Sequence, residues 1–267
     1  AMRGSLSRIE SVLLAACAAA LLAAWWAPPL HQHAHIHDFA DQRLLWGIPC
    51  ALDVLSNLPF ALVGVLGLRF LGRLPAGALP PVQLRLSALF FAGLILTAAA
   101  SAWYHLRPDD AGLAVDRLGM AVAFAGLLGL LVATQVSARA GSVLGATLMV
   151  AGPLAAWLCL RTGNVLPWAL LQFGGMVLVV ALAWRAPAGP GLRVAWGWVI
   201  AAYAVAKVVE VGDHAIFEAT GGWLSGHTLK HLVAACAAWP VIAALRPMQN
   251  GTSEPAPSRP ALHTRRV

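Results

Sequence analysis

Residues 115–136 read VDRLGMAVAFAGLLGLLVATQV, and after Asp116 and Arg117 this stretch contains no charged residue. A run of this length is sufficient to cross the roughly 30 Å hydrocarbon core of a bilayer as a helix. Bilayers admit only helices or closed barrels. The apolar residues follow one another without the alternation that barrel strands show. The stretch therefore predicts a transmembrane helix.

Similar apolar runs recur along the chain, which is 60% hydrophobic and 11% charged with a mean hydropathy of +0.74. Such values lie far outside those of ordinary soluble domains. We predict eight spans, at about residues 9–27, 50–72, 84–105, 115–136, 141–160, 165–184, 192–213 and 227–246. The predicted fold class is thus all-α, a polytopic transmembrane helix bundle.

The short connections between the runs indicate a single transmembrane domain over residues 1–246, with a core of seven helices at about 37–246. The first run is interpreted as an extra retained helix, although its basic start and apolar middle also fit a signal peptide. Residues 247–267 are rich in Pro, Ser and Arg without a core-forming pattern. We expect them to be a disordered cytoplasmic tail.

The net charge of +7 comes from Arg residues scattered at the ends of apolar runs. They form no single basic patch, so we expect no nucleic-acid partner. Most lie in connections on one side of an eight-helix model, which by the positive-inside rule places both termini in the cytoplasm. The four cysteines show no paired spacing and imply no disulfide framework.

Ionisable side chains are distributed unevenly over the predicted spans. Such groups are costly inside a membrane and by default mark a functional site. With the orientation above they fall in the outer, periplasmic half, where an inward-facing bundle would gather them into one pocket. These polar residues are Asp53, Ser56, Asn57, His105, Asp116, Lys207, Glu210, Asp213, His227 and His231.

The stretch SGHTLKHLVAA, residues 225–235, places His227 and His231 four residues apart, on one face of a helix. Gly226 is expected to allow the preceding turn. Two such imidazoles can bind one metal ion, although a pair at a helix start can also bond only to backbone or headgroups. His105 at matching depth favours zinc, because a catalytic zinc has three protein ligands and one open position.

Two further residues complete the predicted hydrolytic site. Ser101 lies one helical turn before His105, where its hydroxyl can hold a water on the metal. Asp116 follows the short loop after His105 and can accept the proton of that water. Zinc with neutral ligands ionises water near neutral pH and polarises a carbonyl. The set therefore indicates a hydrolase.

These residues carry a resemblance to a known family. The motif SAWYH at 101–105 with Asp116, and GHTLKH at 226–231, resemble the bacterial branch of the alkaline ceramidases, whose superfamily includes the progestin and adiponectin receptors. The similarity extends over HDFADQR, DVLSNLPF and YAVAKVVEVGDH. It implies zinc ligation by His105, His227 and His231, with Asp116 and Ser101 catalytic. It further implies hydrolysis of a ceramide or another N-acyl membrane lipid to a fatty acid and a sphingoid base. The bacterial branch implies the bacterial inner membrane as the location.

Two features at the first outer loop are left open by the sequence. Eukaryotic members of the family carry a calcium site, for which Asp38, Asp41 and Asp53 are the candidate Ca²⁺ ligands here. Cys50 and the positive charge of Arg43 depart from that pattern and favour a solvated acidic loop. Before it, HQHAHIHD places four histidines, at positions 31, 33, 35 and 37, which we interpret as an accessory that scavenges zinc or responds to acidic pH.

Other classes of function remain as alternatives. A transport protein would need polar residues at several depths, and a receptor-like protein would keep the zinc site for sensing. Lys207 and Glu210, three residues apart on one helix, are expected to form an internal ion pair. The natural acyl chain and the oligomeric state are not specified by the sequence.

Overall fold

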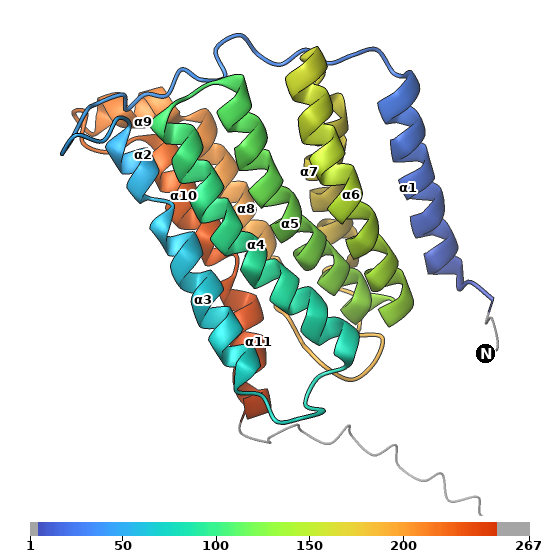
Figure 1. The fold of residues 1–267 in the computed structure, drawn as a ribbon. Coiled ribbons are helices and arrows are strands. Elements are labelled where there is room, and N and C mark those ends of the chain that lie inside the picture. The colour runs from blue at the N-terminus through green and yellow to red at the C-terminus, as the bar shows by residue number, and fades with distance from the viewer. Residues whose placement is uncertain (1–4, 250–267) are drawn as a thin grey trace, which may run out of the picture.

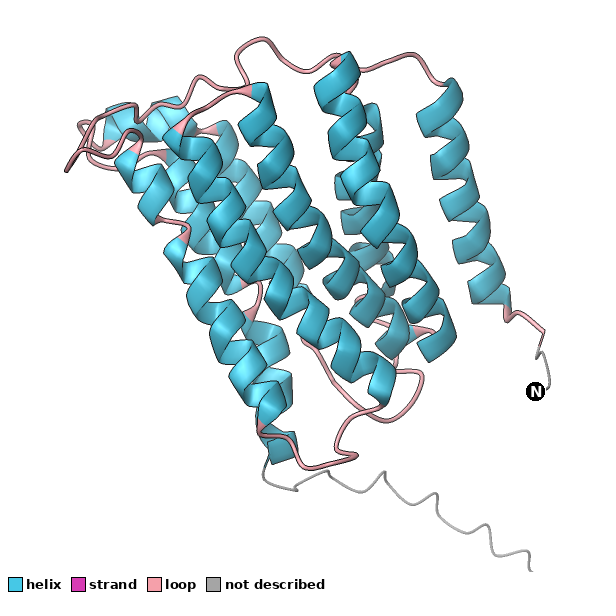
Figure 2. Cartoon of the chain, in the orientation of Figure 1, coloured by secondary structure: helices cyan, strands magenta, loops and turns pink. Residues whose placement is uncertain are grey.

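The computed structural model describes residues 5–249. Helices joined by loops make up this part of the chain, as Figures 1 and 2 show. The helices are α1 (Arg8–Trp26), α2 (Ala51–Leu55), α3 (Leu58–Gly72), α4 (Pro81–Leu106), α5 (Asp110–Gln135), α6 (Ala138–Thr162), α7 (Leu166–Leu182), α8 (Trp196–Val211), α9 (Asp213–Ala219), α10 (Gly226–Cys236) and α11 (Trp239–Gln249). The predicted all-α class is confirmed.

Six helical stretches are long and apolar enough to cross a membrane. They are α1, α4, α5, α6 and the two pairs α2 with α3 and α10 with α11. Helix α7 is apolar but shorter, and α8 has 16 residues. All lie where the sequence predicts spans, so the chain is a helical membrane bundle. The sides of the membrane on which its ends lie remain a prediction.

Helix α1 lies at the edge of the bundle, apart from the core (Figure 1). None of its residues is buried. Its first turn is closed by a capping box of Ser7 and Glu10, and Glu10 also accepts hydrogen bonds from Arg139 at 2.8 Å and Ser137 at 2.7 Å. Helix α1 is attached by these polar contacts and by the packing of Leu13 on the core, which is built by the later helices.

Small residues bring α4 and α5 into close contact at the centre of the bundle. A Cβ atom on Gly93 would lie 2.3 Å from the backbone nitrogen of Ala123, and one on Gly126 would lie 2.3 Å from that of Phe90. Close backbone approach through small residues is the usual means of packing helices in lipid. This contact holds the end of α4 beside the start of α5.

Two spans are interrupted. Helices α2 and α3 are separated at Ser56 and Asn57, and α10 and α11 at 237–238. Helix α11 continues to Gln249, so residues 247–249 are helical and the predicted tail begins too early. Residues 250–267, the remainder of that predicted tail, lie outside the described residues. Helix α9 and the loop before α2 cross one end of the bundle, which we call the loop end (Figure 1).

We expect Gly126→Val to destabilise the bundle by about 1–3 kcal/mol, the usual cost of overpacking a close contact. The added side chain would meet the backbone of α4 at Phe90. Thermal unfolding of the purified protein in detergent measures the effect. The control is Gly174→Val on α7, where a Cβ meets nothing within 4 Å. Equal melting temperatures for the two variants would contradict the assigned α4–α5 contact.

Candidate metal centre

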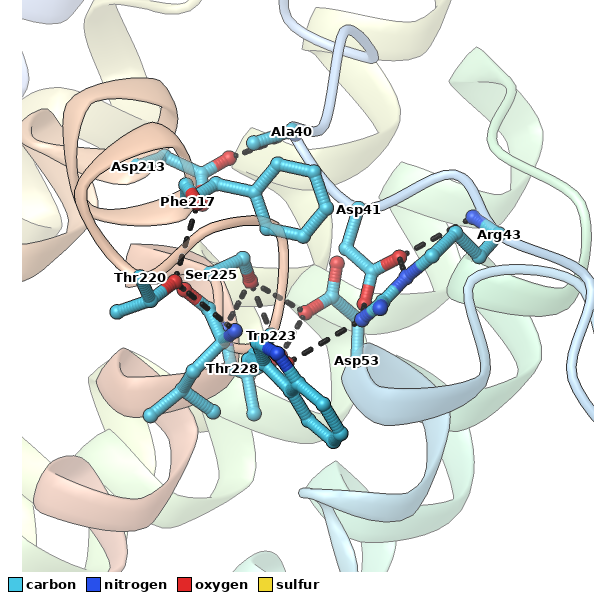
Figure 3. Close-up of polar contacts among 11 residues, drawn as sticks. Ala40, Asp41, Arg43, Asp53, Asp213, Phe217, Thr220, Trp223, Ser225 and Thr228 are labelled. Atoms are coloured by element: carbon cyan, nitrogen blue, oxygen red, sulfur yellow. Dashed lines mark hydrogen bonds and ion pairs between the residues drawn. The ribbon is translucent and has the colours of Figure 1, made fainter.

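Two buried carboxylates hold the start of α10 at the loop end. Ser225 caps the helix, its Oγ accepting the backbone N–H of Thr228 at 2.9 Å. Asp213 Oδ1 accepts the backbone N–H of His227 at 2.7 Å. Asp53 Oδ1 accepts the hydroxyls of Ser225 at 3.2 Å and Thr228 at 2.6 Å, as Figure 3 shows. Carboxylates are favourable at this end because the helix dipole is positive there.

Gly226 has a different role from the one expected. A Cβ at this position would lie 2.1 Å from the carbonyl oxygen of Val209 and 2.7 Å from Cα of Asp213. The residue is the first of α10, and its backbone does not take the left-handed conformation. Glycine is required because α10 begins directly against the end of α8 and the start of α9, rather than for a turn.

The three predicted zinc ligands come together inside the bundle. His105 lies in the last turn of α4, whereas His227 and His231 lie in the first turns of α10. Their ring centroids are 4.8 Å apart for His105 and His227, 5.1 Å for His105 and His231, and 4.8 Å for His227 and His231. One nitrogen from each ring lies within 4.8 Å of the others. The buried cluster can hold a metal ion.

The hydrogen bonds of His231 fix which nitrogen faces the cluster. Ser56 Oγ donates to the backbone oxygen of Asp53 at 3.0 Å and lies 2.8 Å from His231 Nδ1. With its proton committed to Asp53, the hydroxyl accepts Nδ1–H, and Nε2 keeps a free electron pair. Metal-binding histidines commonly donate their second ring N–H in this way. The donors therefore fit a metal ion.

His105 supplies independent support for that fit. Its Nδ1 is buried and has no hydrogen-bond partner within the described part of the chain. An isolated buried polar atom is costly. Only 1% of the residue is exposed, so the ring is removed from bulk solvent. A metal ion among the three rings would give the His105 ring a partner that the described residues do not supply.

A lysine lies directly beside the cluster. Lys230 Nζ is 2.9 Å from His227 Nε2 and 3.1 Å from Glu210 Oε1. Glu210 Oε2 is 2.5 Å from Lys207 Nζ, which confirms the predicted ion pair of α8 and extends it to α10. An ammonium group can only donate, so Lys230 Nζ donates a hydrogen bond to the electron pair of His227 Nε2. The cation thus marks the nitrogen that a metal ion would bind.

Ser101 and Asp116 approach one another at the same level of the bundle. Ser101 is buried one turn before His105, and its hydroxyl is near enough to the carboxyl group of Asp116 to interact with it. Asp116 is also close enough to Lys230 for electrostatic interaction. Since Lys230 contacts His227, the predicted catalytic pair lies near the histidine cluster. Their catalytic roles remain predictions.

Phe39 covers the cluster from the loop side, which sequence reasoning missed. Its ring centroid is 4.6 Å from that of His105 and 4.5 Å from that of His227. Tyr104 packs beside it, 5.6 Å from Phe39 and 5.1 Å from His105. Both aromatic residues are buried. They separate the histidines from the water-facing loop, and a single Phe in a polar loop gave no pattern that predicts this contact.

The three predicted calcium ligands are not brought together. Asp41 is paired through both oxygens with Arg43 at 2.7 Å, and this hydrogen bonding raises the pKa of Arg43 (Figure 3). Asp53 binds the start of α10, as above, and Asp38 is 2.7 Å from His35. Burial raises the pKa of the Cys50 thiol, which disfavours a thiolate ligand. In the described chain the three histidines alone form a metal-binding group of this kind.

An apolar cavity of about 1850 Å³ runs between α3, α8, α10 and α11. Its lining includes Pro59, which directly precedes Phe60, and Leu232, which directly follows His231. The rings of Phe60 and His231 themselves lie 6.2 Å apart. From there the cavity continues to Met248 near the far end of α11. None of the three histidines lines the cavity, which passes the residue that follows His231 and extends along the bundle.

No protein-family model matches the chain, and no curated protein matches it significantly. The geometry of the centre and the chemistry of its residues thus carry the functional argument.

Ser56→Ala is expected to weaken zinc binding about 10- to 100-fold, because a second partner of a metal-binding histidine orients the ring. The variant leaves His231 Nδ1 without its 2.8 Å contact. Competition of the purified protein with a zinc chelator measures the affinity. Ser87→Ala is the control, since this buried hydroxyl on α4 has no hydrogen-bond partner among the described residues. Equal affinities in both variants would exclude the proposed role of Ser56.

Proposed function

We propose that the chain is a zinc-dependent intramembrane lipid amidase, which hydrolyses the N-acyl bond of a ceramide-like lipid to a fatty acid and a sphingoid base. The observation that carries the proposal is the buried three-histidine group inside a membrane bundle. Three neutral protein ligands with one open position are typical of catalytic zinc. The resemblance of SAWYH with Asp116 and of GHTLKH to alkaline ceramidases supports the substrate class. The positive-inside rule favours a periplasmic location for the centre.

In this proposal the protein side chains move one proton and orient the groups that react. Zinc, when bound, ionises water near neutral pH and polarises the amide carbonyl. Asp116 takes the proton of the attacking water and returns it to the leaving amine. Ser101 holds the Asp116 carboxyl group in position through their contact. The C–N bond breaks as water adds its hydroxyl to the acyl carbon and its proton to nitrogen.

The apolar cavity supports a lipid substrate with its amide at the histidines. Phe39 and Tyr104 close the water-facing side of the centre. The cavity begins next to Leu232 and reaches the opposite end of α11 at Met248. The 16 steps from Leu232 to Met248 correspond to about 24 Å at the helical rise per residue. An acyl chain of one leaflet spans about half of the 30 Å hydrocarbon core, or about 15 Å. The cavity is longer than this, so a fatty acyl chain fits along it.

Removal of the proton acceptor is expected to separate metal binding from catalysis. Asp116→Asn should retain stoichiometric zinc and lose about 10²- to 10⁴-fold in rate, the usual contribution of general acid–base catalysis. His231→Ala should lose both. Zinc content and release of fatty acid from a short-chain ceramide are measured on the purified protein.

The control for Asp116→Asn is Glu218→Gln, an exposed carboxylate of α9. It should leave the zinc content and the rate unchanged. Full activity and stoichiometric zinc in His231→Ala would exclude the centre. Zinc binding without hydrolysis of any N-acyl lipid by the wild type would leave a sensing or structural site and exclude the amidase.

A side chain that fills the cavity is expected to shorten the preferred acyl chain. Ala202→Phe narrows the cavity from α8 and should lower the rate for long-chain more than for short-chain ceramide. Ala204→Phe is the matched control, because it lies two residues away, is exposed and does not line the cavity. Chain-length profiles of both variants test the assignment, and coincident profiles would rule out this cavity as the acyl site.

A further inference from the structure

The histidine loop encloses a second, smaller cavity at the loop end. It has a volume of about 300 Å³ and lies between the loop, the start of α5 and the end of α6. Three imidazoles, one carboxylate and one thiol line it, from His31, His33, His37, Asp110 and Cys159. This combination of imidazole, carboxylate and thiol ligands is suited to divalent transition metals such as zinc.

The backbone that carries these histidines is fixed by the turn between α6 and α7. The backbone nitrogen of Gln32 donates to the oxygen of Gly163 at 3.0 Å, and that of Val165 donates to Leu30 at 2.7 Å. Leu30 in turn donates to the side chain of Asn164 at 3.0 Å. His31 and His33 therefore project from a fixed stretch of the loop backbone, and both remain exposed to water.

The polar contacts leave metal-binding atoms on three residues. Asp110 Oδ1 accepts the Gln32 amide at 3.0 Å and lies 3.1 Å from His37 Nε2. No hydrogen bond to Asp110 Oδ2 is found among the described residues, nor to the ring of His31. Within the described residues the ring of His33 has one hydrogen bond, at Nδ1, from the backbone N–H of His35 at 3.2 Å, and it lies 5.5 Å from the ring of His35. His37, with both nitrogens occupied, orients the carboxylate.

The same loop connects this cavity to the buried centre. His37 Nδ1 is 2.8 Å from the hydroxyl of Tyr104, whose ring packs on His105. Two residues further, Phe39 lies against His105 and His227. The loop that carries His37 therefore also carries the aromatic cover of the three-histidine cluster.

We propose that His31, His33 and Asp110 form a second, water-facing site for a divalent transition metal, from which the ion reaches the three-histidine centre. Their donor atoms are not grouped as closely as those of the buried cluster, which is the one close group within the described residues. The site must assemble around the ion, so it binds more weakly and exchanges faster. It accounts for alternate histidines in a loop that the proposed catalysis does not use.

Metal titration of the full chain tests the site without reference to enzymatic activity. Protein stripped with a chelator is titrated with Co²⁺ and Zn²⁺. The wild type should bind two equivalents, one tight and one weak. The double variant His31→Ala/His33→Ala should keep only the tight equivalent, and His227→Ala/His231→Ala only the weak one. His35→Ala is the matched control, because His35 is paired with Asp38 and does not line the cavity; it should bind two.

The delivery role is tested by the time course of zinc uptake at the buried centre at limiting zinc. The His31→Ala/His33→Ala variant should load several-fold more slowly than the wild type, with the same final affinity of the tight site. Retention of the weak equivalent in this variant, or its absence from the wild type, would overturn the second site. Equal loading rates would overturn its delivery role. Neither outcome depends on whether the protein hydrolyses a lipid.

Discussion

The structure of the loop end depends on the carboxylate of Asp213, which joins two separate parts of the site. One oxygen accepts the backbone N–H of His227 at 2.7 Å, and the other accepts that of Ala40 at 3.0 Å. The first contact fixes the start of α10 and hence the two histidines of its first turns. The second holds the loop whose Phe39 covers those histidines. A charged group taken into such a buried place needs hydrogen bonds of this quality.

The charges around the three histidines are arranged so that a cation can join them. Glu210 lies between Lys207 at 2.5 Å and Lys230 at 3.1 Å, and Lys230 also contacts His227. In an apolar bundle each of these charges requires a partner. Lys230 contacts two acceptors, His227 and Glu210. When a metal ion takes His227 Nε2, Lys230 therefore still has Glu210 as its counter-ion. Binding of the metal therefore does not isolate a buried ammonium group.

The sequence predicts the helices and the clustering of His227 and His231 because both follow local rules. Long apolar runs specify the spans, and the spacing of His227 and His231 places them on one helical face. His105 is predicted to join them because it lies at the same depth in the membrane as these two histidines. The contacts that orient these ligands are different in kind. Ser56 meets His231, and Asp53 meets Thr228, over separations of 175 residues along the chain. No periodicity encodes such contacts.

The same distinction explains why the predicted calcium ligands are dispersed. A pattern of acidic residues does not say which carboxylate is already neutralised by a near neighbour, as Asp41 is by Arg43. Nor does it show that Asp53 is needed at a helix start. Phe39 escaped prediction for a related reason, because an aromatic residue in a polar loop acquires its role only when the loop folds over the bundle.

The distribution of buried ionisable groups favours local chemistry over passage across the membrane. Among the described residues these groups are Asp41, Asp53, His105, Arg117, Asp213, His227 and His231, all at the loop end. Toward the other end the buried polar side chains are neutral, and Gln83, Thr134 and Gln135 bond to backbone atoms. A transport path needs ionisable or solvated groups at successive depths. The buried ionisable groups named above are confined to the loop end, and the apolar cavity extends away from it, which agrees with the proposed lipid whose polar bond stays at the histidines while its chain lies along the bundle.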